Sequence, residues 1–383
     1  MWTLSEEQLL LKESAERFVV AEYDFERRKR DIEQGRYSDA LWQQFAELGW
    51  LGIAFDEQWG GFGGSTTDIA VLMQALGSGL VVSPYSANIL LAGRLIADIG
   101  SDTQRDEFLP SLIAGERQLA FAYAEPQSRY DLFDVQTTTQ PRELGFVING
   151  QKSLVLNGDA ASHIVVTARS HGGRRDQNGI SLFVVDTSSP GVKKTAYRTN
   201  DDHYAADIAL NDVALEGSAL LGSPGDAFEW VERAIDEASV AHCAEAIGAM
   251  DRIMQITAEY MRTREQFGRP ISKNQALQFR MVEMFYALEE SRSMLQWALE
   301  TLGGEPAQRR AAVSALKVKL GDTARHIGQQ GVQLHGAIGL TAEYSVGHFY
   351  KRLESIRTLF GDPEHHVARY GRWSEAQNTR AAT

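Results

Sequence analysis

Between two long helical patterns, the chain reads Arg262-Thr263-Arg264-Glu265-Gln266-Phe267-Gly268-Arg269-Pro270-Ile271. Arginine keeps its positive charge and binds phosphate oxygens in pairs, and glutamine can both donate and accept hydrogen bonds. Phe267 adds an aromatic face, and Gly268 lets a ligand approach the backbone. This combination indicates a site for a pyrophosphate beside an adenine. The alternative is a basic helix end that stops at Gly268 and Pro270.

The sequence around this segment predicts a helical bundle. Apolar side chains recur at helical spacing on two faces, Leu277, Met281, Met284, Phe285 and Leu288 on one and Val313, Leu316, Leu320 and Ile327 on the other. Long helices with one apolar face each pack against one another, so residues 223–383 are predicted to form a C-terminal bundle.

The N-terminal part of the chain, residues 1–117, is predicted to be all-helical. Ser5 followed by Glu6, Glu7 and Gln8 is typical of a helix start, with a capping hydroxyl and acids in the first turn. Further helices are predicted over 38–48, 67–77, 85–99 and 103–113. The glycine-rich run 60–64 lacks the Lys and Ser/Thr of a P-loop, which favours a plain connector.

Residues 118–222 carry short β-type runs instead. These runs are predicted over 119–123, 145–148, 164–168, 180–185 and 206–210, with turn signals at Asn149-Gly150 and Asn157-Gly158. Several short strands at this spacing predict a small antiparallel barrel or sandwich. The predicted fold class is therefore α+β and multidomain.

The amino-acid composition narrows the classes of molecule that this chain could bind. In 383 residues, 38 Lys and Arg stand against 51 Asp and Glu, giving a net charge of −13. This charge argues against nucleic acid or an anionic membrane surface as the main partner. The single cysteine, Cys243, excludes an internal disulfide and fits a reducing compartment. Because the N-terminus lacks a basic signal region and no apolar run is long enough to cross a bilayer, we expect a cytoplasmic protein.

His365 and His366, beside Asp362 and Glu364, raise the question of a metal site. Adjacent residues point apart on a helix, and no second cluster completes a tetrahedral set of ligands. A helix that begins near Asp362-Pro363 explains these residues better, so we predict no metal.

The segment from Arg264 to Ile271, followed by Gln275, resembles the flavin-contacting signature of the acyl-CoA dehydrogenase family. Other motifs of the family occur in its order along nearly the whole chain: Leu4-Ser5-Glu6-Glu7-Gln8, Glu47-Leu48-Gly49, Gly60-Gly61, Phe108-Leu109-Pro110, Ile148-Asn149-Gly150-Gln151-Lys152, Gln333-Leu334-His335-Gly336 and Glu343-Tyr344. Within the family, the chain is most similar to the small subunit of pimeloyl-CoA dehydrogenase, through Gln127-Ser128-Arg129-Tyr130-Asp131, Phe360-Gly361-Asp362 and His365-His366.

The resemblance implies a fold, a cofactor and a reaction. The fold would be an all-α N-terminal domain, a β-barrel middle domain and a C-terminal four-helix bundle that also makes tetramer contacts. The cofactor would be FAD, and the reaction would be α,β-desaturation of an acyl-CoA thioester, with a dicarboxylyl-CoA as one candidate substrate. An electron-transferring flavoprotein would accept the electrons.

In the family, the ADP half of the flavin is held by the neighbouring subunit. The resemblance assigns this role to Arg264, Gln266, Phe267 and Gln275 and to the turn formed by Gln333, Leu334, His335, Gly336 and Ala337. Ala337 stands where a glycine is usual.

The residues that the family uses for proton abstraction are replaced in this chain. Phe360 occupies the position of the usual catalytic Glu, and Ala238 occupies the alternative position on the first helix of the bundle. Glu237 is a weak candidate, because one residue of offset turns a side chain by about 100° on a helix. We therefore expect Glu237 to be a solvated helix acid and predict no catalytic residue.

Leu154 and Leu156 replace a Trp and a Thr that cover the flavin ring in the family. This chain keeps the residues that would hold the ADP half of the flavin and lacks those that would cover the ring and remove the proton. The small, base-less subunit of an α2β2 enzyme would show this pattern, and its partner would be a large acyl-CoA dehydrogenase subunit. One alternative is a homotetrameric dehydrogenase with a displaced base at Glu237. Another is a non-catalytic assembly protein of the same fold.

Overall fold

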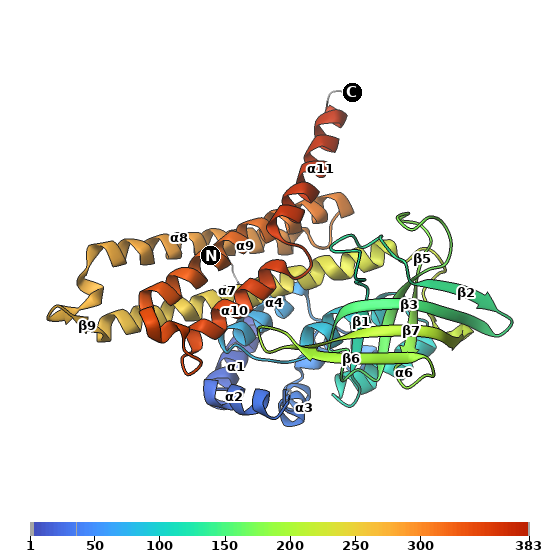
Figure 1. The fold of residues 1–383 in the computed structure, drawn as a ribbon, viewed down its shortest axis with the longest axis horizontal. Coiled ribbons are helices and arrows are strands. Elements are labelled where there is room, and N and C mark those ends of the chain that lie inside the picture. Colours follow the sequence, from blue (N-terminus) through green and yellow to red (C-terminus); the bar gives the residue numbers. More distant parts are fainter. Residues whose placement is uncertain (1–3, 36, 382–383) are drawn as a thin grey trace. The chain divides into compact units, whose positions relative to one another are not determined.

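The computed structural model describes residues 4–35 and 37–381 (Figure 1). The described residues form two compact units, each built from separate segments of the chain. The first unit combines segments within 1–33, 66–81 and 239–383, and the second combines 34–65 with 82–238. The predicted N-terminal helical region therefore contributes to both units.

Two helices of the second unit begin at polar caps that the sequence provides. Helix α3 (Asp39–Glu47) is capped by the Ser38 hydroxyl, and α6 (Asp102–Ile113) begins with a capping box in which Ser101 and Gln104 bond reciprocally. Short 3-10 turns lie between them: η1 (Trp50–Gly52) and η2 (Glu57–Trp59). These helices match the predicted ranges 38–48 and 103–113.

The predicted helix 85–99 is present but is not a regular α-helix. It is π-helical over η3 (Ser86–Gly93) and becomes α-helical over α5 (Arg94–Ile99). Within the π-helical part, the buried Asn88 accepts the N–H of Leu119 at 2.7 Å. This bond ties the helix to the first strand of the sheet.

Among the described residues, the sheet of the second unit has eight strands. They are β1 (Leu119–Ala122), β2 (Thr138–Arg142), β3 (Gly145–Leu156), β4 (His163–Arg169), β5 (Ile180–Asp186), β6 (Val192–Arg198), β7 (Tyr204–Glu216) and β8 (Leu220–Leu221). Their order is β6-β7-β3-β2-β4-β5-β8, and β1 pairs with β4. The predicted antiparallel pairing is wrong for β4 on one side, where β1 runs parallel to it and β2 also pairs with it in parallel, through Thr138 and Arg169.

The first unit is helical. Its N-terminal helices are α1 (Glu6–Glu22), α2 (Phe25–Glu33) and α4 (Thr66–Ser78), and α1 has the predicted capping box between Ser5 and Gln8. Its C-terminal helices are the main part of α7 (Phe228–Thr263), α8 (Gln275–Thr301), α9 (Pro306–His335), α10 (Ser345–Thr358) and α11 (Pro363–Ala381). Helix α9 packs against α8, α10 and α11, so it is central to the predicted bundle (Figure 1).

Glycines allow α4 and α7 to approach closely in the first unit. A Cβ atom at Gly77 would lie 2.0 Å from the backbone oxygen of Glu245, and one at Gly248 would lie 1.9 Å from that of Gln74. Neither contact leaves space for a side chain, so both positions require glycine.

Helix α11 begins where the sequence predicted a helix start, beside its two histidines. Asp362 accepts the N–H of His365 at 2.8 Å, which confirms the predicted helix start. The described residues contain no group of three or more His, Cys, Asp or Glu side chains arranged to hold a metal ion. None of the described helices is both long enough and apolar enough to span a membrane.

Candidate cofactor-binding site

The segment after α7 forms a tight hairpin. Helix α7 ends at Thr263, and β9 (Glu265–Gln266) then pairs with β10 (Arg269–Pro270). Phe267 and Gly268, between the two strands, have φ angles of +54° and +76°. Two consecutive left-handed residues are typical of the type I′ turn that matches the twist of a hairpin. The segment is therefore a projecting arm and not only the end of a helix.

Backbone bonds hold both sides of this hairpin. The N–H of Arg264 donates to Tyr260 O at 2.8 Å, and the N–H of Ile271 donates to Arg264 O at 2.8 Å. The guanidinium of Arg264 is exposed and has no partner among the residues that the structure describes. The side chain of Phe267 is 99% exposed. The hairpin thus presents a cation and an aromatic ring to its surroundings from a fixed backbone.

The second predicted segment ends α9. Gly336 has φ +66° and ψ −141°, a conformation that essentially only glycine adopts. Gln333, Gly336 and Ala337 are exposed at this turn. Leu334 and His335 are buried, so any contribution of these two residues to a ligand would come from their backbone.

His335 connects the two segments. Its ring lies 4.5 Å from that of Tyr260, at the end of α7, and 5.1 Å from that of Tyr344. Its Nδ1–H donates to Gly331 O at 2.8 Å, and burial lowers the pKa of the imidazole. Its buried Nε2 has no hydrogen-bond partner within 4–35 and 37–381. The end of α7 and the end of α9 therefore lie together, although Tyr260 and His335 are far apart in the sequence.

Gln275 lies near the same hairpin because it is the first residue of α8. The exposed members of the predicted set are Arg264, Gln266, Phe267, Gln275, Gln333, Gly336 and Ala337. A guanidinium, three amides and an uncovered aromatic ring have the donors and the stacking surface that a pyrophosphate and an adenine need. The residues present fit the ADP half of a flavin.

A buried charged cluster in the first unit was missed by sequence reasoning. Arg352 on α10 donates to Glu245 on α7 through Nε (2.6 Å) and Nη2 (2.7 Å). His242 Nδ1 lies 2.8 Å from the same carboxylate, and its ring lies 5.7 Å from that of Phe360. Burial raises the pKa of Glu245, but the charge of Arg352 and the bonds from Arg352 and His242 outweigh it and hold that pKa far below its usual range.

Phe360 itself is buried and has a φ of +62°, which is uncommon for a residue with a side chain. The buried Lys317 donates to Ile356 O (2.8 Å) and Leu359 O (2.7 Å), at the end of α10 just before Phe360. Burial lowers the pKa of Lys317 to about 8. The position to which the resemblance assigns the catalytic Glu is thus filled by a phenyl ring on a turn that Lys317 holds.

In the second unit, Ala238 is fully buried and Glu237 lies between two arginines. Glu237 accepts from Arg233 Nε at 2.8 Å and lies 3.6 Å from Arg94 Nε, with only 12% of its side chain exposed. The expectation of a solvated acid is wrong, because α5 and α7 enclose Glu237 and each provides a cation.

The positions expected to cover the flavin ring are hydrocarbon. Leu154 has φ +50° at a bulge of β3 and is half exposed. Its N–H donates to Asp207 Oδ1 at 3.2 Å, and the same carboxylate accepts from the Tyr197 hydroxyl at 3.0 Å. With Leu156 also apolar, neither side chain can donate a hydrogen bond to a ligand.

Three family models match this chain in sequence order: acyl-CoA dehydrogenase N-terminal domain over residues 5–116, middle domain over 120–213 and C-terminal domain over 225–374. The chain belongs to the acyl-CoA dehydrogenase family. It is therefore a flavoprotein oxidoreductase acting on CH–CH bonds, with FAD as its cofactor and with the predicted helical, β and helical domains.

Individual relatives agree with this assignment. A probable acyl-CoA dehydrogenase of Bacillus subtilis, YngJ, is 28% identical over 349 residues, 90% of this chain and 91% of the relative. The structure of an FAD complex of PigA has a TM-score of 0.90 at 25% identity, covering 97% of this chain and 98% of that chain. The ChsE4–ChsE5 complex from Mycobacterium tuberculosis shares the fold, with a TM-score of 0.87 at 23% identity and coverage of 97% of both chains.

Proposed function

We propose that this chain is the base-less subunit of an α2β2 acyl-CoA dehydrogenase and contributes the ADP half of the FAD site of a larger partner subunit. The observation that carries the proposal is an asymmetry between two sets of residues. The set around Arg264 and Gln333 keeps the residue types expected for the ADP half except at Ala337, whereas Phe360 and Ala238 fill both positions to which the resemblance assigns a carboxylate.

The shape of the hairpin supports a role toward another chain. An aromatic side chain that is 99% exposed has almost no contact with the residues of its own subunit that the structure describes. In the proposed assembly, the Arg264 guanidinium binds pyrophosphate oxygens, Phe267 covers the adenine, and Gln266, Gln275 and Gln333 provide hydrogen bonds.

Helix α8 supports the same arrangement. Its core side faces α9, but a second row of large apolar side chains is exposed at helical spacing: Phe279 (58%), Val282 (46%), Phe285 (50%) and Tyr286 (63%). Contiguous exposed apolar side chains mark surfaces that another protein covers. The fold is compatible with such pairing, since the ChsE4–ChsE5 structure is a complex of two chains.

The reaction proposed for the complex is α,β-desaturation of an acyl-CoA thioester, with a dicarboxylyl-CoA as a candidate substrate. When bound, FAD supplies the hydride acceptor. The large subunit supplies the carboxylate that removes the α-proton, and an electron-transferring flavoprotein takes the electrons. We place the complex in the cytoplasm, in keeping with the single buried Cys243.

Two other assemblies remain as outcomes of the test. A homotetramer with Glu237 as its base is disfavoured by the two arginines that hold that carboxylate. A non-catalytic assembly protein would not need the exposed donors of the hairpin.

Co-expression with a candidate large acyl-CoA dehydrogenase subunit separates these cases. We expect the chain alone to carry little flavin, because Leu154 and Leu156 offer no donor to the ring, and we expect a yellow hetero-oligomer when both chains are present. Flavin absorbance relative to protein, measured across a size-exclusion peak, is the readout. A near-stoichiometric yellow homotetramer from the chain alone would contradict the proposal, and a colourless hetero-oligomer would favour the assembly protein.

A further inference from the structure

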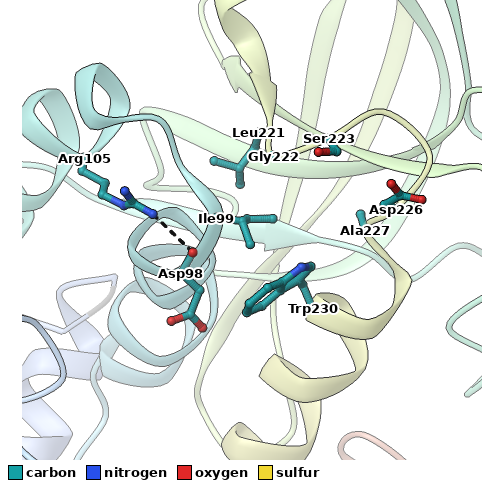
Figure 2. A pocket seen from close by; sticks show the side chains of 9 residues that line it. All are labelled: Asp98, Ile99, Arg105, Leu221, Gly222, Ser223, Asp226, Ala227 and Trp230. Atoms are coloured by element: carbon teal, nitrogen blue, oxygen red, sulfur yellow. Dashed lines mark hydrogen bonds between the residues drawn. The ribbon is translucent and has the colours of Figure 1, made fainter.

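The second unit contains a pocket of about 340 Å³ that the proposed function does not use (Figure 2). It lies where the end of α5, the start of α6 and the connection from β8 to α7 meet. Its lining includes Asp98, Ile99, Arg105, Leu221, Asp226 and Trp230. The volume is at the lower end of the range for small-molecule sites, so the pocket suits a small ligand.

One wall of the pocket is apolar. Ile99 and the Trp230 indole lie next to each other, and Leu221 lies above them in Figure 2. The connection keeps this space open at Gly222, which has φ +73° and where a Cβ atom would approach Ile99 Cδ1 to 3.1 Å. A flat or branched hydrocarbon body would be shielded from water against this wall.

Arg105, the cationic side chain that lines the pocket, already makes hydrogen bonds within the chain. Arg105 donates through Nε to Ala97 O (2.9 Å) and through Nη2 to Asp98 O (3.3 Å), the bond drawn in Figure 2. Its Nη1 donates to Asp102 Oδ1 at 3.2 Å. These bonds direct the guanidinium to the C-terminal carbonyls of α5, which leaves little of its charge for an anionic ligand.

The two carboxylates of the pocket, Asp98 and Asp226, have fewer hydrogen-bond partners than Arg105. Asp98 lies 3.3 Å from Arg94 Nε but, among the described residues, its carboxylate accepts no hydrogen bond. Asp226 is exposed, and its carboxylate has neither an ion pair nor a hydrogen bond in the described part of the chain. A half-buried carboxylate has room for two or more donors, and for Asp98 the described residues place one cation, Arg94, at ion-pair distance.

We propose that this pocket binds a small organic cation, with its ammonium group donating to Asp98 and its apolar body against the Trp230 indole. Ammonium–carboxylate hydrogen bonds are charge-assisted and therefore strong, and an indole is the best aromatic partner for a cation. Asp226 contributes negative potential at the exposed side of the pocket and attracts the ligand. An anion of the same shape is repelled by both carboxylates.

The test uses the full chain and phenethylammonium chloride as the probe, with binding measured by ligand-observed NMR and calorimetry. Two molecules of similar shape serve as ligand controls, neutral 2-phenylethanol and anionic 3-phenylpropionate. We expect saturable binding of the cation, at least about tenfold weaker binding of the alcohol, and no binding of the anion, because the lost contact is a hydrogen bond between charged groups.

Variants locate the site. Asp98→Asn should weaken phenethylammonium binding about tenfold or more, and Trp230→Leu should weaken it by a similar factor. Asp226→Asn, at an exposed position without partners, should weaken binding by about two- to threefold at low salt. The matched control is Glu229→Gln, which removes the same charge from the residue next to Trp230 but from a side chain that does not line the pocket. It should leave the affinity unchanged.

Equal affinity for the cation and the alcohol would overturn the proposal, and so would a Glu229→Gln effect as large as that of Asp98→Asn. Absence of saturable binding of the probe to the wild-type chain would overturn it as well. If Asp98→Asn fails to fold, the probe affinities of the Trp230→Leu and Asp226→Asn variants still test the proposal. None of these readouts depends on flavin or on a partner subunit, so their failure is distinct from failure of the proposed function.

Discussion

Arg264 lies at the residue where α7 becomes the hairpin, with its backbone bonded on both sides and its guanidinium unpaired in the described structure. Arg264→Ala in the reconstituted complex should remove a charge-assisted contact of about 1.5–3 kcal/mol, which corresponds to a roughly tenfold to hundredfold weaker FAD affinity. Flavin titration of the apo-complex measures this. Arg262→Ala, which removes an exposed arginine two residues earlier, is the matched control. An unchanged affinity in Arg264→Ala would mean that the hairpin does not bind the cofactor.

Glu237 allows a second test at the residue scale. Its carboxylate is held by Arg233 at 2.8 Å and by Arg94 at 3.6 Å, so it is an ion-pair partner and not a free base. Glu237→Gln should leave the turnover of the complex within about a factor of two, whereas loss of a true base costs on the order of 10² or more. A loss of that larger size in an assembled, yellow complex would place the catalytic base in this chain.

Sequence reasoning at this scale reaches residues that are neighbours in the chain. The segment around Phe267 and Gly268 could be proposed as a site from consecutive residues, whereas the hairpin that presents them was not predicted. The cluster of Glu245, His242 and Arg352 could not, since Arg352 is 107 positions from Glu245 and only the packing of α10 on the bundle joins them. The environment of Glu237 was missed for the same reason, because Arg94 comes from a different helix.

At the scale of elements, apolar periodicity predicted the long helices and the buried strands. It missed α2, whose sequence Phe25–Glu33 is mostly charged, and the strands β2 and β6, whose side chains are mostly exposed. These elements form because a neighbouring element supplies the pairing or packing partner, which no local pattern contains.

Helices α7 and α10 are joined by the buried pair of Glu245 and Arg352. Glu245→Gln should destabilise the chain by about 3 kcal/mol at neutral pH, because it leaves the guanidinium buried without its counter-charge. Chemical denaturation followed by circular dichroism gives this value. The same change in an exposed pair, Glu16→Gln next to Lys12 on α1, should cost less than about 0.5 kcal/mol.

The pH dependence of this difference follows from the lowered pKa of Glu245. A carboxyl whose pKa is depressed on folding adds stability that is fully present above its unfolded pKa, about 4.3, and is lost as the pH falls toward its folded pKa. The stability difference between wild type and Glu245→Gln should therefore shrink as the pH falls below about 4.3. A difference that stays constant down to the lowest pH at which the chain folds would contradict the assigned ion pair.

At the scale of the whole molecule, the two compact units are interleaved along the sequence. The strands of the second unit depend on residues outside the predicted segment 118–222. Asn157 accepts from the Tyr37 hydroxyl (3.3 Å), Asn88 accepts the N–H of Leu119 (2.7 Å), and Gln104 donates to Ser218 O (2.8 Å).

A fragment of residues 118–222 should therefore fail to fold cooperatively, although it contains every strand of the sheet. A longer fragment, 34–238, keeps these bonds and is the matched control, with its internal helices included. Thermal unfolding followed by circular dichroism and the dispersion of amide NMR signals distinguish the two. A sharp unfolding transition in the short fragment would show that the sheet is stable without the helical segments.

The exposure of Phe267 has a consequence for the amount of this protein that accumulates in a cell. In the proposed assembly, the hairpin is sheltered only after the larger subunit has been made. Copies produced in excess keep an aromatic side chain and the apolar row of α8 in water, where chaperones and proteases recognise such surfaces. In that assembly, surplus copies would be removed, and the steady-state amount of this chain would follow the rate of synthesis of its partner rather than its own.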